Sequence, residues 1–250
     1  MKKPRLNLAT LSVSVCLALV SIPRSATGVQ AIPAPIDARV SNHWEIAQAF
    51  KPPNLGAPPA TAGGGVRGSC IKSSTPLTAL MPANSLPLTV TANPTFLVYI
   101  PKTEAKTVEF VLKDEQDNDV YRTTMPVPAT AGIVSVKLPQ DKSVQPLKVG
   151  KNYHWFLALV CQAEDRSEDV FVEAWIQRTT LSADAAKELQ KVAPTDRAGV
   201  YAKNGIWHES VSNLAELRRE RPNDAKIAAN WQELLKSVGL EKIAEEPLVQ

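Results

Sequence analysis

The sequence predicts a mainly β protein, in which an antiparallel β-sandwich over residues 77–181 is followed by a small α-helical segment over residues 182–250. Two observations carry this prediction. Residues 77–181 contain about seven short apolar runs separated by Pro, Gly and polar turn residues, which is typical of antiparallel sandwiches. Beyond Leu181 the spacing of apolar residues changes from a period of 2 to the period of 3.6 that indicates amphipathic helices. Since no helix-length pattern interrupts the runs, a parallel α/β sheet is disfavoured.

Each predicted strand is a short apolar or alternating run. The runs lie at residues 88–91, 96–100, 108–112, 120–124, 133–138, 153–161 and 170–176. Residues 114–119 are polar and predict the turn of a hairpin, and residues 164–169 form a second polar loop.

A short motif before the sixth of these strands refines the fold class. Leu147, Gly150 and Tyr153 follow the spacing Leu-x-x-Gly-x-x-Tyr, which resembles the corner that precedes the sixth strand of fibronectin type III and immunoglobulin-like domains. In those domains the tyrosine hydroxyl is hydrogen-bonded to the backbone at the corner. We therefore expect an immunoglobulin/fibronectin-III-like sandwich.

The C-terminal segment is predicted to form three or four amphipathic helices. Ser182 is placed to cap the first helix, which Pro194 ends, and Gly239 is placed to end the last. A middle helix carries a basic cluster at its C-terminal end, where cations suit the helix dipole, namely Arg218, Arg219 and Arg221. Residues 201–223 resemble one tetratricopeptide unit, but because one copy cannot stack, a local helical hairpin is favoured.

The N-terminus has the three parts of a secretory signal peptide. Lys2, Lys3 and Arg5 precede an apolar run over residues 6–22, and small residues then allow cleavage after Gly28 or Ala31. We predict a cleavable signal peptide over residues 1–28 and a periplasmic or secreted protein. Its removal takes away four basic residues, so 28 basic against 25 acidic residues becomes 24 against 25. The mature chain then lacks the basic excess typical of nucleic-acid-binding proteins, and no later apolar stretch is long enough to span a membrane.

Residues 29–76 are predicted to be a Pro/Gly-rich linker. Cys16 is lost with the signal peptide, which leaves Cys70 and Cys161 as an even pair in an oxidising compartment. A disulfide between them would close a loop of about 90 residues and stabilise the fold by roughly 4–5 kcal/mol. Two buried free thiols are the alternative.

No motif for a reaction, a cofactor or a metal ion is found. The three histidines are far apart in the sequence, and the two cysteines lack zinc or dithiol spacing. His154 is predicted to face solvent from a strand. Together with Trp155 and Trp175 it is a candidate contact residue, with core packing as the alternative for the tryptophans.

Several short motifs together resemble the cyanobacterial family classed as domain of unknown function 928, over roughly residues 56–248. They are Gly56-Ala-Pro, Gly63-Gly-Gly, Arg67-Gly, Cys70, Leu77-Thr-Ala-Leu-Met-Pro82, Pro94-Thr-Phe96, Phe171-Val-Glu-Ala-Trp175-Ile-Gln-Arg178 and Gly205-Ile-Trp207. The resemblance implies a cyanobacterial cell-envelope protein and transfers no catalytic residue.

The leading functional hypothesis is a non-catalytic periplasmic interaction module, whose partner is an envelope protein or a glycan. An enzyme or metal-dependent envelope factor with a spatially assembled site, or a carbohydrate-binding module, is the alternative. A cavity that holds His154 or His208 with two carboxylates would favour the enzyme.

Overall fold

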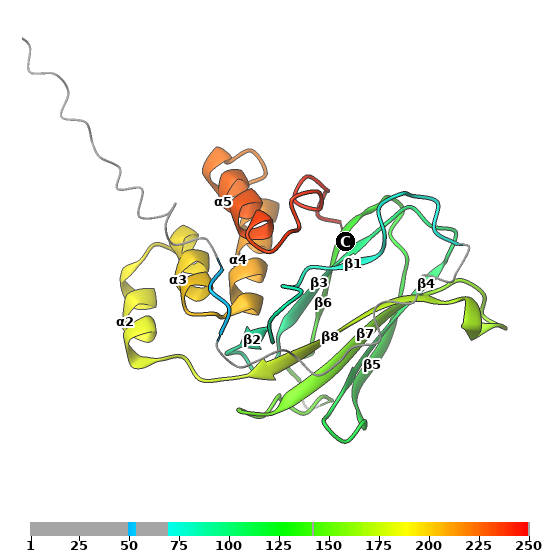
Figure 1. Ribbon diagram of the computed structural model, residues 1–250, viewed down its shortest axis with the longest axis horizontal. Helices are drawn as coiled ribbons and strands as arrows, with labels where there is room; N and C mark the ends of the chain where they lie inside the picture. The colour runs from blue at the N-terminus through cyan, green and yellow to red at the C-terminus, as the bar shows by residue number, and fades with distance from the viewer. Residues whose placement is uncertain (1–49, 54–69, 142, 250) are drawn as a thin grey trace, which may run out of the picture. The chain divides into compact units, whose positions relative to one another are not determined.

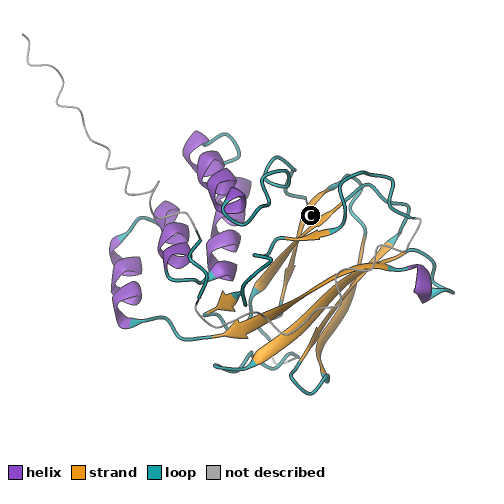
Figure 2. Ribbon diagram, viewed as in Figure 1, coloured by secondary structure: helices purple, strands orange, loops and turns teal. Residues whose placement is uncertain are grey.

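The computed structural model describes residues 50–53, 70–141 and 143–249, and these residues are mainly β, with two sheets and four α-helices (Figures 1 and 2). The strands are β1 (Thr78–Ala79), β2 (Leu88–Thr89), β3 (Thr95–Ile100), β4 (Thr107–Lys113), β5 (Asp119–Pro126), β6 (Gly132–Lys137), β7 (Asn152–Val160) and β8 (Val170–Arg178). The helices are α2 (Ala183–Lys191), α3 (Arg197–Lys203), α4 (Trp207–Glu220) and α5 (Ala225–Lys236). The predicted signal peptide and most of the predicted linker lie outside the described residues.

Three strands form one sheet in the order β1-β3-β6, and five form the other in the order β2-β8-β7-β4-β5. All pairings are antiparallel except β2 with β8, which is parallel. The predicted hairpin is present as β4 and β5. Its polar turn is held by the carboxylate of Asp114, which accepts hydrogen bonds from the backbone N–H groups of Gln116 and Asn118.

The predicted strand at residues 88–91 is shorter than expected. Only Leu88 and Thr89 pair with β8, because the backbone N–H groups of Val90 and Thr91 donate instead to the Glu209 carboxylate of α4. A helix side chain therefore replaces a neighbouring strand at this edge.

Aromatic side chains from the two sheets meet in a shared core. Phe96 of β3 lies with its ring 5.0 Å from that of Phe110 on β4 and 5.3 Å from that of Trp155 on β7. Along β7, buried and half-buried residues alternate strictly, as expected for a strand with one face on the core. The inner faces of the two sheets are thus packed on each other through these rings.

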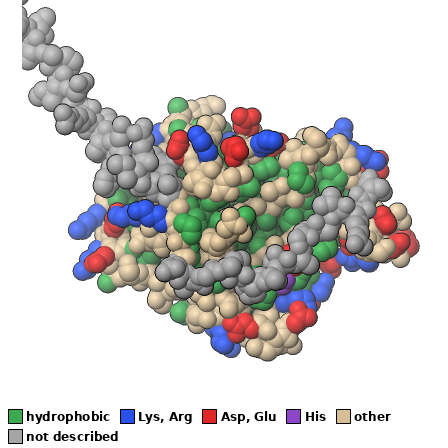
Figure 3. Space-filling model, viewed as in Figure 1, with side chains coloured by type: hydrophobic (Ala, Val, Ile, Leu, Met, Phe, Trp, Pro, Cys, Tyr) green, Lys and Arg blue, Asp and Glu red, His purple; other side chains and the backbone are tan. Residues whose placement is uncertain are grey.

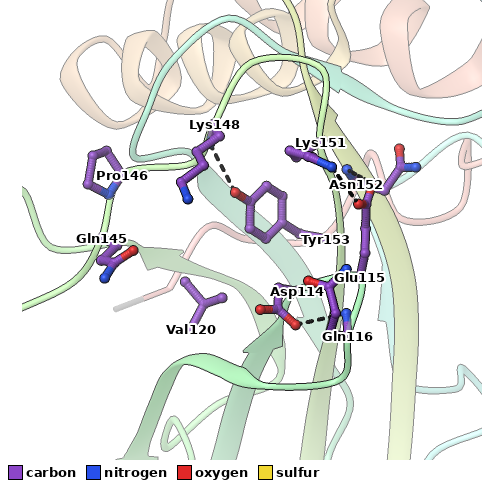
Figure 4. A pocket seen from close by; sticks show the side chains of 10 residues that line it. All are labelled: Asp114, Glu115, Gln116, Val120, Gln145, Pro146, Lys148, Lys151, Asn152 and Tyr153. Atoms are coloured by element: carbon purple, nitrogen blue, oxygen red, sulfur yellow. Dashed lines mark hydrogen bonds and ion pairs between the residues drawn. The ribbon is translucent and has the colours of Figure 1, made fainter.

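The predicted tyrosine corner forms as expected (Figure 4). The backbone N–H of Lys148 donates to the Tyr153 hydroxyl at 2.9 Å, and Gly150 adopts φ +78°, a left-handed conformation that glycine tolerates well. A cavity of about 120 Å³ lies beside the corner. Its wall is braced by Glu115, whose carboxylate accepts from the Asn152 N–H and the Lys151 ammonium.

The helices pack on the sheets and on one another. α4 contacts β3 and β2, and both α3 and α5 pack against α4. The expected caps are present, since Ser182 accepts from the N–H of Ala185 and Gly239 has φ +79°. Helices α3 and α4 form a hairpin around Gly205, as predicted. Within the described residues, no helix is long and apolar enough to cross a bilayer.

Two residues inside the predicted linker belong to the core. Phe50 is 7% exposed, and its ring meets that of Trp207 edge-on at 5.0 Å, while Cys70 is 5% exposed. Both side chains therefore pack in the core of the described structure. Because the segment is rich in Pro and Gly, its local pattern did not indicate that these two apolar side chains are buried. Burial of their apolar surface stabilises the fold.

Candidate functional site

Cys70 and Cys161 form a disulfide, with Cα atoms 5.6 Å apart. The carbonyl of Cys70 accepts hydrogen bonds from the Glu104 N–H and the Thr103 hydroxyl, in the turn that follows β3. Cys161 directly follows β7. The bond therefore ties the three-stranded sheet to the five-stranded sheet and has a structural role.

Trp155, one of the three candidate contact residues, has a side chain that is fully buried between the sheets. Because successive side chains on a strand point to opposite faces, Trp155 shares the inner face with the corner residue Tyr153. That spacing was a signal in the sequence that could have assigned it to the core.

His154 and Trp175 lie on the outer face of the five-stranded sheet, as cross-strand neighbours on β7 and β8. Their rings stack with centroids 4.4 Å apart and an interplanar angle of 4°. His154 Nε2 lies 3.0 Å from the Glu173 carboxylate, and the two side chains are 16% and 5% exposed. Burial lowers the pKa of His154. The structure thus brings two of the three candidate contact residues together, in a cluster that is half-buried.

His208 is held in the interior, at the start of α4. It is 2% exposed, its Nδ1 donates to the Thr95 carbonyl at 3.2 Å, and its ring meets Phe96 edge-on. Burial lowers the pKa of His208 to about 4. The imidazole is therefore neutral at pH 7 and out of reach of a ligand.

This buried histidine predicts a loss of stability on acidification. The pKa falls from 6.5 in the unfolded chain to about 4 in the folded protein, so the unfolded state binds the extra proton between these values. The contribution of His208 to the free energy of unfolding is therefore greatest above pH 6.5. We expect this contribution to fall by about 3 kcal/mol as the pH is lowered to 4. Chemical denaturation of the wild type and His208→Gln from pH 7 to pH 4 measures it, because other titrating groups cancel in the difference. A pH-independent difference would contradict the assignment.

Glu209, the next residue, is a buried carboxylate with a positioning role. Its Oε1 accepts from the Thr89 hydroxyl at 2.6 Å and from the N–H groups of Val90 and Thr91 at 3.1 and 3.0 Å. Burial raises the pKa of Glu209, against these hydrogen bonds. The carboxylate ties α4 to the end of β2.

Charged side chains of both signs are interspersed around the rim of the face in Figure 3, and hydrophobic side chains gather across its middle. Among the described residues, no group of three or more His, Cys, Asp or Glu is placed to hold a metal ion.

A cavity of about 350 Å³ lies at the C-terminal end of α4, lined by Arg218, Arg219, Pro222 and Leu248; we call it the arginine pocket. Leu248 belongs to the C-terminal segment, which returns from α5 to the sheets (Figure 1). There Leu248 forms a parallel bridge with Ile133 of β6, and the Val249 N–H donates to the Ile133 carbonyl. The pocket thus joins a helix end to a sheet edge.

The two arginines are held in place by neutral groups. The Arg218 guanidinium lies over the Trp231 ring, 5.0 Å from its centroid, and its buried Nη1 has no hydrogen-bond partner among the described residues. Arg219 donates to the Ser135 hydroxyl at 2.7 Å. Burial lowers the pKa of both side chains, although a guanidinium stays charged.

The neighbouring Arg221 shows the contrast. It forms an ion pair with Asp224 at 3.7 Å, whereas no described carboxylate lies within the 4.0 Å of an ion pair from Arg218 or Arg219. The helix dipole explains why cations suit this end of α4. The dipole does not explain two half-buried arginines that form no ion pair with a described carboxylate, and this arrangement can receive an anion.

A second cavity of about 140 Å³ adjoins the first through Arg219. It lies between α4 and one face of the three-stranded sheet, and its polar lining is Thr95, Ser135, Lys137, Ser212, Glu216 and Arg219. Sequence analysis assigned the arginines to the helix dipole alone. It missed the site because the partners Ser135 and Trp231 lie on another strand and another helix.

Comparison with known proteins gives a family and no activity. A family model described as Domain of Unknown Function (DUF928) matches residues 62–248. A search of curated proteins found no match.

Proposed function

The chain belongs to the DUF928 family, and from its own geometry we propose that it is a non-catalytic binding module whose ligand site is the arginine pocket. The observation that carries the proposal is the pair of half-buried arginines in a cavity of about 350 Å³ with no described carboxylate in ion-pair range. Ligand pockets are typically of about 300–1,000 Å³, so this cavity has room for a small group.

The surrounding chemistry supports recognition. Trp231 and Ser135 orient the two guanidinium groups, and Pro222 and Leu248 supply the apolar part of the lining. His154, His208 and the disulfide lie outside this pocket, and their contacts support structural roles for them.

We further propose that the β domain is an immunoglobulin/fibronectin-III-like sandwich and that the protein works in the periplasm of a cyanobacterium or is secreted. The tyrosine corner and the shared core of the two sheets support the first part. The signal-like N-terminus and the Cys70–Cys161 bond support the second, because disulfides persist in oxidising compartments.

The partner is then a component of the cell envelope, either a protein or a glycan. Crosslinking and capture from the native envelope fraction tests this with the wild type, the Arg218→Ala/Arg219→Ala variant and the matched control Arg221→Ala. We expect the wild type and the control to recover the same component and the double variant to lose at least nine-tenths of it, roughly a tenfold loss of affinity.

Equal recovery by all three proteins, or recovery of nothing, would overturn the proposal. Thermal melting of each variant shows whether a loss of capture reflects a loss of fold.

A further inference from the structure

The two adjoining cavities allow the ligand class to be named. We propose, resting on the proposed function, that the arginine pocket binds the carboxylate of an acidic saccharide, a uronate, while the adjoining cavity receives its neighbouring hydroxyl groups.

The arrangement of Arg218 favours a planar anion. Its guanidinium lies over the Trp231 ring, 5.0 Å from the ring centroid, and Nη1 is buried without a hydrogen-bond partner among the described residues. A guanidinium presents parallel N–H groups along one edge, and a carboxylate accepts two of them in the same plane. A carboxylate in the pocket would bind a guanidinium in this way.

The charge around the pocket favours one negative charge over two. The pocket lies at the C-terminal end of α4, which carries the negative end of the helix dipole, whereas phosphate sites typically use helix N-termini. Glu216 lines the adjoining cavity and interacts electrostatically with Arg219. The helix dipole and Glu216 partly balance the positive charge of the two arginines. The remaining positive charge suits a monoanionic carboxylate better than a phosphate dianion.

The adjoining cavity favours a saccharide over an acidic peptide. Thr95, Ser135 and Ser212 line it together with the oppositely charged Lys137 and Glu216 and the apolar Leu97 and Ala215. Hydroxyls both donate and accept, an ammonium only donates and a carboxylate accepts, so this set suits the hydroxyl groups of a sugar.

Isothermal titration of the full mature chain tests this with four probes: a trigalacturonate, its neutral galactose counterpart, a hexaglutamate peptide and inorganic phosphate. We expect the uronate to bind at least tenfold more tightly than any other probe, which is a difference of about 1.4 kcal/mol. Equal or tighter binding of the neutral sugar, the peptide or phosphate would overturn the ligand class.

Two substitutions separate the parts of the proposal. Arg218→Lys keeps the charge and removes the planar fork, so we expect about a tenfold loss of uronate affinity, with Arg221→Lys unchanged as the control. Ser212→Ala removes a hydroxyl group from the lining of the adjoining cavity and should weaken binding of the trigalacturonate several-fold. Wild-type affinity in both Arg218→Lys and Ser212→Ala would overturn the assignment.

Failure of this inference differs from failure of the proposed function. If Arg218→Ala/Arg219→Ala abolishes envelope capture and no uronate binds, the binding module stands and the saccharide is wrong. If the same variant captures as the wild type does, the pocket itself is wrong.

Discussion

Breaking the disulfide between Cys70 and Cys161 is expected to lower the free energy of unfolding by about 4–5 kcal/mol. The two residues are 91 positions apart, and closing so long a loop removes much conformational entropy from the unfolded chain. The bond also joins the turn after β3 to the end of β7, so the sheets separate more easily without it. Urea unfolding with and without a reductant measures the effect.

The Cys70→Ala/Cys161→Ala variant supplies the control. Reductant should lower the stability of the wild type and leave the variant unchanged, since the variant has no bond to reduce. A wild type that loses less than about 1 kcal/mol on complete reduction would show that hydrogen bonds at the Cys70 segment already hold the sheets together.

Trp207→Ala is expected to cost about 3–5 kcal/mol, because it removes a fully buried indole and leaves a cavity between α4 and the sheets. The Trp207 Nε1 donates to the Leu80 carbonyl at 2.8 Å, and its ring meets that of Phe50. Trp207→Phe keeps most of the aromatic surface but leaves the Leu80 carbonyl without its hydrogen-bond donor. We therefore expect a smaller loss in the free energy of unfolding, of about 1–2 kcal/mol. Denaturant unfolding of both variants separates packing from hydrogen bonding.

Trp175→Ala is the matched comparison, because Trp175 is half-buried on the outer face of a sheet and should cost less than Trp207. The sheets and helices should also unfold in one transition, since Trp207 belongs to their shared core. A Trp207→Ala variant in which the helices melt first while the sheets keep wild-type stability would contradict this coupling.

Much of the local structure was predictable because it depends on neighbours in the chain. The runs at residues 96–100, 108–112, 133–138 and 153–161 form strands close to their predicted limits. The corner at Tyr153 and the caps at Ser182 and Gly239 depend on residues that are only a few positions away in the sequence. Such features follow from periodicity and from the preferences of glycine and hydroxyl side chains.

The errors arose where a distant segment decides the outcome. Residues 90 and 91 leave the strand pattern because Glu209, more than a hundred positions away, accepts their hydrogen bonds. Phe50 belongs to the core because its ring packs against the ring of Trp207. Neither partner is visible in the local pattern.

The mainly β character, the helical C-terminal segment and the cysteine pair available for a disulfide could all be predicted from the sequence. Which aromatic residues are buried, and which side chains line a common cavity, depends on the tertiary structure. The arginine pocket combines α4, α5, β6 and the C-terminal segment, and strand and helix propensities do not specify which of these meet. Which strands and helices contact each other depends on how their apolar faces are buried together. A site built from side chains that are distant in the sequence therefore forms only when these faces have packed.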